Sequence, residues 1–411
     1  MGYYLDFQKK HKGLFMDLKD FSILCKERLD FYFESFERAM SKGYIKYNNK
    51  VINQAFYPTI LLCVESDKRI LSFELLGWVR ARKSLKIKLR DNISVEQLTK
   101  IDRNKNNAES LFTFDNSDKC VLSNLMFRDQ EAIDYLDSQG HVMAEKFSAG
   151  FTIGGNVSHL MDFKGVSSCM FFNCIISYVN NHILRARYIN ALVMFDARLD
   201  EGGILDRLVY FIRKETVFGV QHFSDETELS WVKASHLISL VLNDKIHETT
   251  IGDYINDHPD ILLKSLGYSK IIYEPNLEWL EKTSDNPDLY INPDALLERN
   301  DGYYDICDFK KGLVKKKSIT KGERRRRRFI DGVGEGLAQL DNYEEYFTYA
   351  SNAQHALERY GVKVNSPRKI LIIGNIENTK RVEVEEALRG RTDTIVIDYD
   401  SLISAYIGAI K

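Results

Sequence analysis

Two aspartates and a lysine in the C-terminal third of the sequence have the types and spacing to hold a divalent cation beside an ammonium group. Asp294 opens a predicted strand after Pro293, and Asp308 and Lys310 lie two residues apart on the next predicted strand. Because side chains alternate along a strand, Asp308 and Lys310 face the same side, and a hairpin would place Asp294 beside them. Adjacent carboxylates favour a cation between them, and all-oxygen ligation favours Mg²⁺. The lysine would orient and activate an attacking water while the metal neutralises charge on a phosphodiester.

Three further side chains fall where such a site needs them. Glu248 begins a predicted helix before the strands, from which its carboxylate could reach the metal. Gln339 and Tyr343 form an i, i+4 pair on a later helix, so both polar ends share one face and could orient Lys310 or the phosphate. Each has a structural alternative: Glu248 also suits a helix N-terminus, where the dipole stabilises an acid, and the other two could cap a polar patch.

The core pattern also has competing interpretations. Pro-Asp and Asp-x-Lys pairs arise by chance in charged chains, where they are more often turns and solvated edge strands. The Asp-Gly at 301–302, between two apolar runs, favours a hairpin and so a common site. Asp288 also follows a proline, but we prefer Asp294 because an apolar strand follows it directly.

A strongly basic segment lies between these two parts of the site, although the formal net charge of the chain is only -2. Five consecutive arginines repel one another, so backbone phosphates are the favoured partner, with binding that depends on salt but not on sequence. The alternatives to DNA binding are that the segment is the solvent-exposed start of a helix or a tract that resembles a localisation signal. The side chains predicted to contact DNA are Lys311, Lys315, Lys316, Lys317, Lys321, Arg324, Arg325, Arg326, Arg327 and Arg328.

The order of these motifs resembles the nuclease domain of the Shedu antiphage defence proteins, which is of the PD-(D/E)XK type. The resemblance covers about residues 245–410 and does not extend to the N-terminal half. The family more often has Glu at the position of Asp308, and Asp is an acceptable ligand in the wider superfamily. The matching features are Glu248-x-x-Ile251-x-x-Tyr254-Ile255 with Pro259, Pro293-Asp294, Asp308-Phe309-Lys310, Gln339-x-x-x-Tyr343, and the ending KILIIGNIENTKRVEVEEAL with IDYDSLI.

The resemblance implies a Mg²⁺-dependent deoxyribonuclease, with Mn²⁺ able to substitute, that cleaves double-stranded DNA internally in bacterial antiphage or antiplasmid defence. It also implies a homo-oligomer, a tetramer in that family, whose variable N-terminal region senses the invading DNA. Two alternatives stay open: a non-catalytic DNA-binding sensor on a nuclease fold, and a repair or restriction nuclease. The implied catalytic residues are Asp294, Asp308, Lys310, Glu248, Gln339 and Tyr343, with Asp294, Asp308 and Glu248 as metal ligands.

At 411 residues the chain exceeds one ordinary core, and its length predicts two or three domains. We expect a mixed α+β regulatory or DNA-sensing domain over residues 1–230 and an α/β sandwich of the restriction-endonuclease type over 240–411, with the boundary between 219 and 240. In the first part, the patterns predict a helix over 21–40, strands over 59–66, 69–81, 84–90, 169–179 and 188–199, and a turn at 201–203. In the second, they predict helices over 227–244, 248–263, 330–350 and 382–388, a last helix at the C-terminus, and strands over 268–275, 295–297, 303–310, 369–374 and 394–398.

Composition excludes several other classes. The six cysteines show no CxxC spacing, which argues against structural zinc and favours reduced thiols in a cytoplasmic protein. The first residues carry no apolar signal segment, and no run approaches the roughly 18 apolar residues of a membrane span. The phosphate-binding pattern GxxxxGK[ST] is absent from the sequence, which argues against an ATP-driven motor.

Overall fold

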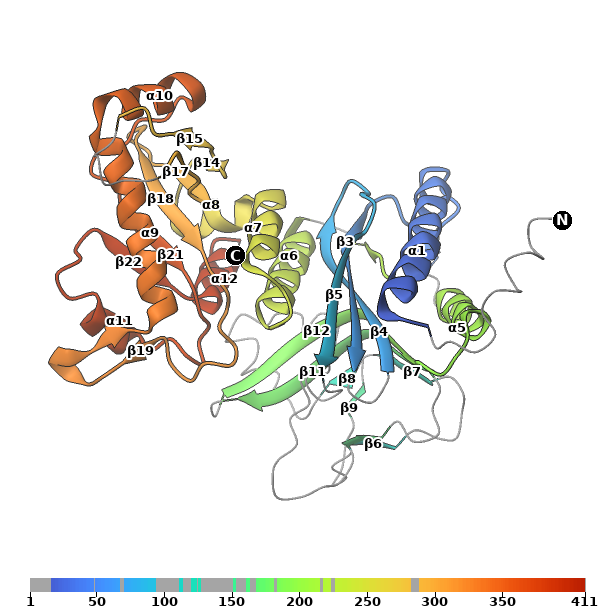
Figure 1. The fold of residues 1–411 in the computed structure, drawn as a ribbon. Coiled ribbons are helices and arrows are strands. Elements are labelled where there is room, and N and C mark those ends of the chain that lie inside the picture. Colours follow the sequence, from blue (N-terminus) through green and yellow to red (C-terminus); the bar gives the residue numbers. More distant parts are fainter. Residues whose placement is uncertain are drawn as a thin grey trace. The chain divides into compact units, whose positions relative to one another are not determined.

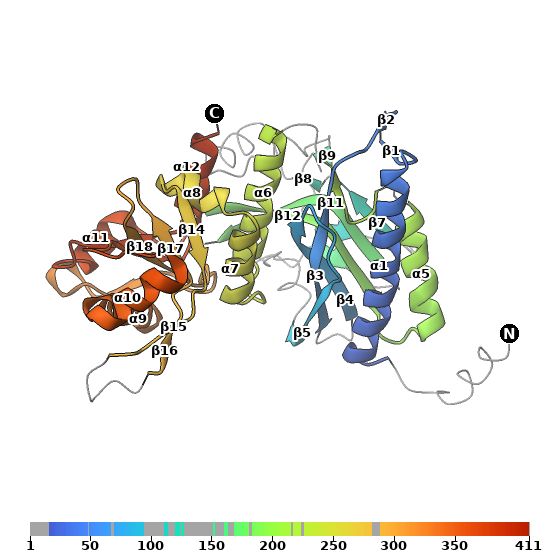
Figure 2. The same cartoon turned by 90° about the horizontal axis from the view of Figure 1, so that it is seen from above.

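The computed structural model shows an α+β protein whose chain divides into two compact units (Figures 1 and 2). The first unit contains most of the chain up to Ser224, and the second contains Asp225–Lys411. The structure describes residues 16–47, 49–66, 70–93, 111–113, 120–123, 125–126, 151–152, 160–162, 168–180, 183–214, 217–222, 226–281 and 288–410.

The first unit is built on a mixed sheet in which α1 (Leu18–Ser41) and α5 (Glu201–Lys214) cover one face (Figure 2). The ring of Phe195 lies 5.7 Å from Phe21 of α1 and 6.4 Å from Phe211 of α5, which fixes both helices on that face. In order, the main strands of the sheet are β13 (Gln221–His222), β3 (Ala55–Ser66), β4 (Ile70–Val79), β12 (Ile183–Asp196), β11 (Ser168–Asn180) and β7 (Cys120–Ser123), with β5 (Lys86–Ile93) beside β3.

Helix α1 forms where the sequence repeats apolar residues at helical spacing. Its N-cap is Asp17, whose carboxylate accepts a hydrogen bond from Asp20 N at 2.7 Å and satisfies a free donor of the first turn. Its buried face consists of Phe21, Ser22, Cys25, Leu29, Phe33 and Phe36.

Residues 201–203, predicted as a turn, instead begin α5, so that prediction was wrong. Asp200 Oδ1 accepts the backbone N–H of Gly203 at 2.8 Å and supplies the cap that this glycine-rich start needs. The remaining short strands of the N-terminal part are β1 (Lys46–Tyr47), β2 (Lys50–Val51), β6 (Leu111–Thr113), β8 (Leu125–Met126), β9 (Phe151–Thr152) and β10 (Leu160–Asp162).

The second unit contains a five-stranded sheet between helices (Figure 1). Its first three strands are antiparallel and its last three are parallel. Helix α9 (Asp331–Thr348) packs on β18 (Tyr304–Phe309) and β21 (Lys369–Ile372). Helix α7 (Glu248–Asp257) also contacts β18. In spatial order the strands are β14 (Lys270–Tyr273), β17 (Ala295–Glu298), β18 (Tyr304–Phe309), β21 (Lys369–Ile372) and β22 (Thr394–Ile397).

Two predicted helices are changed in the structure. The helix predicted over 248–263 is two helices, α7 and α8 (Asp260–Leu266), because Pro259 cannot continue the hydrogen-bond ladder of α7. The helix predicted over 330–350 ends at Thr348, and α10 (Ala350–Tyr360), which was not predicted, follows it. The other elements are α6 (Glu226–Val241), α11 (Arg381–Ala387), α12 (Tyr399–Gly408), β15 (Leu277–Glu278), β16 (Tyr290–Ile291), β19 (Thr320–Lys321), β20 (Arg328–Phe329) and the 3-10 helix η2 (Arg324–Arg326).

The core of the second unit lies between α9 and the sheet. Leu296 and Ile306 are register partners on β17 and β18, so their side chains share one face. They belong to one buried cluster with Leu337 and Leu340 of α9 and with Leu371 of β21. This packing fixes the face of the hairpin that α9 covers.

Four cysteines that the structure describes, Cys25, Cys63, Cys169 and Cys307, are buried and form no disulfide. The side chains of Cys120 and Cys174 lie outside the described residues. Among the helices of the described ranges, none combines the length and the apolar character needed to cross a membrane.

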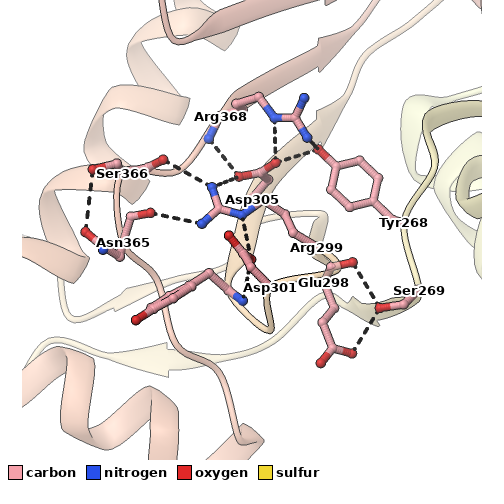
Figure 3. A network of polar contacts seen from close by, with 10 residues as sticks. Tyr268, Ser269, Glu298, Arg299, Asp301, Asp305, Asn365, Ser366 and Arg368 are labelled. Carbon is pink, nitrogen blue, oxygen red and sulfur yellow. Dashed lines mark hydrogen bonds and ion pairs between the residues drawn. The ribbon is translucent and has the colours of Figure 1, made fainter.

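Hydrogen bonds to a buried carboxylate hold the start of β18 in place (Figure 3). Asp305 is fully buried and accepts hydrogen bonds from Tyr268 OH at 2.6 Å and from the backbone N and Nε of Arg368 at 2.8 and 2.9 Å. Arg299 Nη1 adds a bond of 3.2 Å from the other strand of the hairpin. The network ties the β17–β18 hairpin to the start of β21, and so sets where the far end of β18 lies.

We expect Asp305→Ala to lower the free energy of unfolding by about 1–3 kcal/mol, because the Tyr268 hydroxyl and the backbone N–H of Arg368 lose their acceptor and two partly exposed guanidinium groups lose their charge partner. Urea denaturation of the full chain measures this loss. The matched control is Asp301→Ala, which removes an exposed carboxylate from the same Arg299 and should cost less than about 1 kcal/mol. Equal losses in both variants would show that the buried network does not hold the hairpin.

Candidate metal site on the second sheet

The β17–β18 hairpin brings Asp294 and Asp308 together. Ala295 pairs with Cys307, and continuing this register by one residue sets Asp294 opposite Asp308 on the face that α9 covers. Asp294 Oδ2 accepts the backbone N–H of Phe309 at 2.6 Å, which fixes its side chain against β18. Asp288, the other candidate, is exposed and accepts a hydrogen bond from Asn342 at 3.2 Å. The geometry therefore favours Asp294.

The two carboxyl groups lie beside each other, and Asp294 is partly buried whereas Asp308 is fully buried. Asp308 is only 1% exposed. Burial, and next the charge of Asp308, raise the pKa of Asp294 to about 7. Burial also raises the pKa of Asp308, although Lys310 and a hydrogen bond from Asp294 work against that rise. Near neutral pH the pair therefore favours either a shared proton or an added cation.

Lys310 supplies one positive charge to this pair. Its Nζ lies 2.8 Å from Asp308 Oδ2 and donates a hydrogen bond of 3.0 Å to Gln339 Oε1. Burial disfavours the ammonium, but the neighbouring Asp308 outweighs it, so the pKa of Lys310 is raised. Lys310 is thus a fixed positive charge and hydrogen-bond donor at neutral pH, and it is poorly suited to take up a proton.

Helix α9 carries the two residues that orient Lys310. Gln339 Nε2 donates to Tyr343 OH at 2.7 Å, and Tyr343 OH donates to the backbone oxygen of Asn292 at 3.1 Å. Asn292 lies two residues before Asp294, so the chain of hydrogen bonds returns to the same hairpin. The predicted i, i+4 pair is therefore connected to Lys310 in the structure.

Two further residues shape the position of Lys310, and the sequence analysis missed both. A Cβ on Gly336 of α9 would lie 3.4 Å from Lys310 Cε and 3.0 Å from Leu371 Cδ1, so the small residue leaves room for the lysine stem. Its place three residues before Gln339 was a usable signal. Tyr399 OH, from α12, donates to the backbone oxygen of Lys310 at 2.7 Å. No local pattern links Tyr399 to a residue 89 positions earlier.

Glu248 lies in the first turn of α7 and acts on the pair through its charge. It contributes to raising the pKa values of both Asp294 and Asp308, and also that of Lys310. Throughout the described ranges, no three His, Cys, Asp or Glu side chains cluster closely enough to hold a metal ion. Metal ligation by Glu248 therefore stays a prediction.

The Asp294–Asp308 pair fits a hard divalent ion. Asp308 Oδ2 is buried and contacts Lys310 Nζ at 2.8 Å, and the carboxylate has further lone pairs that a metal ion could share with the ammonium. Mg²⁺ is commonly held by only one or two carboxylates, with water and substrate oxygens completing its shell. Two aspartates without a third acid are thus a sufficient protein contribution for this ion.

The structure divides the predicted basic segment into paired and exposed side chains. Lys315 lies 2.8 Å from Asp244, Lys321 pairs with Asp331, and Arg327 pairs with two acids of α11. These three side chains form ion pairs within the chain. Lys311 is half-buried. The exposed members are Lys316, Lys317, Arg324, Arg325, Arg326 and Arg328, and Lys315 is also largely exposed despite its ion pair.

We expect Asp294→Asn to stabilise the metal-free protein at pH 8. The folded chain keeps the Asp294 proton up to about pH 7, whereas an ordinary aspartate loses it near 3.8. Between these values the folded state binds more protons than the unfolded state, so stability falls as pH rises. Removing the charge should recover on the order of 1–2 kcal/mol at pH 8, and the gain should shrink towards pH 4.

Thermal denaturation in EDTA across this pH range measures the effect, with the exposed Asp288→Asn as the control. Added Mg²⁺ should stabilise the wild type more than Asp294→Asn, because the variant has lost a ligand. A gain for Asp294→Asn that does not depend on pH would contradict the buried-pair account.

No protein family matches this chain, and a search of curated proteins likewise finds no match. The geometry of the chain's own residues, above all Asp294 and the buried Asp308 beside Lys310, is what bears on function.

Proposed function

We propose that the second unit is a Mg²⁺-dependent DNA nuclease of the PD-(D/E)XK type, in which Mn²⁺ can substitute. The observation that carries this proposal is the Asp294–Asp308 pair, in which Asp308 is buried and Asp294 is partly buried, with Lys310 beside it. Once Asp294 is ionised, the two carboxylates and one ammonium carry a net negative charge, which a further cation would offset. The mixed five-stranded sheet between helices supports the same assignment.

In this proposal Asp294 and Asp308 hold the ion, which when bound polarises the phosphodiester and acidifies a water. Lys310 would orient the water or a phosphate oxygen by donating hydrogen bonds from its ammonium group. Gln339 accepts from Lys310 and limits the directions in which the ammonium can point. Tyr343 holds Gln339 in turn, so both act as positioning residues.

DNA is the proposed substrate because exposed cations lie in the same unit as the carboxylate pair. Lys316 and Lys317 are exposed and follow Lys310 closely in the chain. Phosphate backbones are the polyanions that such side chains bind without regard to sequence. On the resemblance to the Shedu proteins, we extend the proposal to internal cleavage of double-stranded DNA in antiphage or antiplasmid defence, by a homo-oligomer whose N-terminal unit selects the DNA.

We expect Lys310→Ala to lower the rate of Mg²⁺-dependent DNA cleavage by about 10²- to 10⁴-fold, because the charge that positions the reacting groups is lost. Supercoiled plasmid and linear duplex, with Mg²⁺ or EDTA, provide the measurement. The matched control is Lys363→Ala, an exposed lysine of the same unit that should cleave like the wild type.

Two results would count against the nuclease. Equal cleavage by the wild type and Lys310→Ala would remove the assigned site. Salt-sensitive DNA binding with no cleavage under any divalent ion would instead identify a binding protein that keeps a nuclease fold.

A further inference from the structure

The arginine run is part of a folded hairpin. We call residues 320–329 the arginine arm. Its two strands, β19 and β20, pair through Thr320 with Phe329 and Lys321 with Arg328. The 3-10 turn η2 forms the tip between them, and Ile330 N donates to Ile319 O at 3.0 Å to close the base. The arginines at the tip therefore have defined backbone positions.

A glycine gives the arm its tight turn. Gly322 has φ +85°, and a Cβ there would lie 2.6 Å from the backbone oxygen of Arg326. Arg326 N donates to Glu323 O and Arg327 N donates to Arg324 O, both at 3.0 Å. A larger residue at 322 would have to open this turn.

Arg327 anchors the arm to α11. Its guanidinium lies 3.0 Å from Glu383 and 2.6 Å from Glu386, and Thr320 Oγ1 donates to the same Glu383 at 2.7 Å. Figure 1 shows the hairpin beside α11, near the start of α9. Arg327 therefore serves the structure of the arm, although it belongs to the same run as its neighbours.

The other arginines of the arm face solvent. Arg324, Arg325, Arg326 and Arg328 are exposed, and the first three make no ion pair with any residue that the structure describes. Holding these charges together on an ordered turn costs electrostatic free energy. An anionic partner would offset that cost.

We infer that the arginine arm binds backbone phosphates of duplex DNA, with Arg324, Arg325, Arg326 and Arg328 as contacts and Arg327 as anchor. Asp331 and Gln339 are separated by about 12 Å of helix axis in α9. The five residues from Arg326 to Asp331 span at most about 17 Å even when fully extended. Arg326 therefore lies within about 30 Å of Gln339, which is less than one turn of B-DNA, about 34 Å.

The surface of the arm favours a duplex over other polyanions. None of the exposed large apolar side chains of the described residues lies between 311 and 331, and Phe329 is buried. The arm thus offers no aromatic platform for stacking single-stranded bases and no apolar face for a lipid surface. The relevance of the distance between the arm and Lys310 rests on the proposed nuclease function. Phosphate binding by the arm does not require cleavage.

The test measures binding of the full chain to a fluorescent duplex in EDTA, where no cleavage occurs, over a range of salt concentrations. The combined variant R324A/R325A/R326A should bind about tenfold or more weakly at physiological salt and lower the salt slope by about 2–3, since each phosphate contact contributes about 0.9. Its melting temperature should stay that of the wild type, because the removed side chains are exposed. Arg359→Ala, an exposed arginine on α10, is the matched control and should change neither value.

Two variants test whether DNA binding depends on the backbone geometry of the arm or only on its number of positive charges. Gly322→Ala keeps every arginine but opens the turn, so it should weaken binding by several-fold. Arg327→Ala should weaken binding and also lower the melting temperature, because it frees Glu383 and Glu386 from their partner. Full binding by Gly322→Ala would show that only the number of charges matters and would overturn the arm as a built contact.

The remaining outcomes are equally decisive. An unchanged salt slope in the combined variant overturns the inference, even if the protein cleaves DNA. Preferential binding to single-stranded DNA, or to vesicles containing phosphatidylserine, that depends on the same arginines also overturns it. A reduced slope on duplex DNA supports the arm even if Lys310→Ala shows that the nuclease assignment is wrong.

Discussion

Two carboxyl groups that lie side by side, one buried and one partly buried, resist being ionised together unless positive charge lies near them, and the candidate site of the second unit is organised around that constraint. Burial and mutual repulsion raise the pKa of Asp294 to about 7, while Lys310 offsets only part of the charge. This arrangement lowers the stability of the metal-free protein when Asp294 is ionised. The ion pair between Lys310 and Asp308 offsets only part of that loss. In the proposed nuclease, binding of a cation and a charged substrate would give a reason to keep this arrangement.

The pair keeps its geometry because β18 is fixed along its whole length. At its start, Asp305 joins the hairpin to β21 through buried hydrogen bonds. Along its middle, Ile306 packs in the core beneath α9. At its end, Tyr399 holds the backbone of Lys310, while Gly336 lets its stem pass beneath the helix. A rigid strand can hold reacting groups within the narrow tolerance that catalysis needs.

The basic segment shows how neighbouring residues of one type divide between structure and recognition. Arg327 points to the acids of α11 and holds the arginine arm, while Arg326, one position earlier, faces solvent. Lys315 is likewise tied to Asp244 while Lys316 is exposed. An uneven charge distribution of this kind explains how a chain of net charge -2 can still present a local surface of exposed positive charge.

Sequence alone determined the hairpin of the candidate site, since the Asp-Gly turn, the alternation along 303–310 and the i, i+4 spacing of Gln339 and Tyr343 are all local patterns. It also located most strands and helices, but it missed α10 and the break at Pro259. Only the tertiary structure decided that Tyr399 and Gly336 position Lys310 and that Arg327 pairs with α11. Local patterns report which face a side chain takes, whereas its partner depends on packing between segments far apart in the chain. The pKa values of Asp294 and Asp308 likewise follow from burial, which no single segment determines.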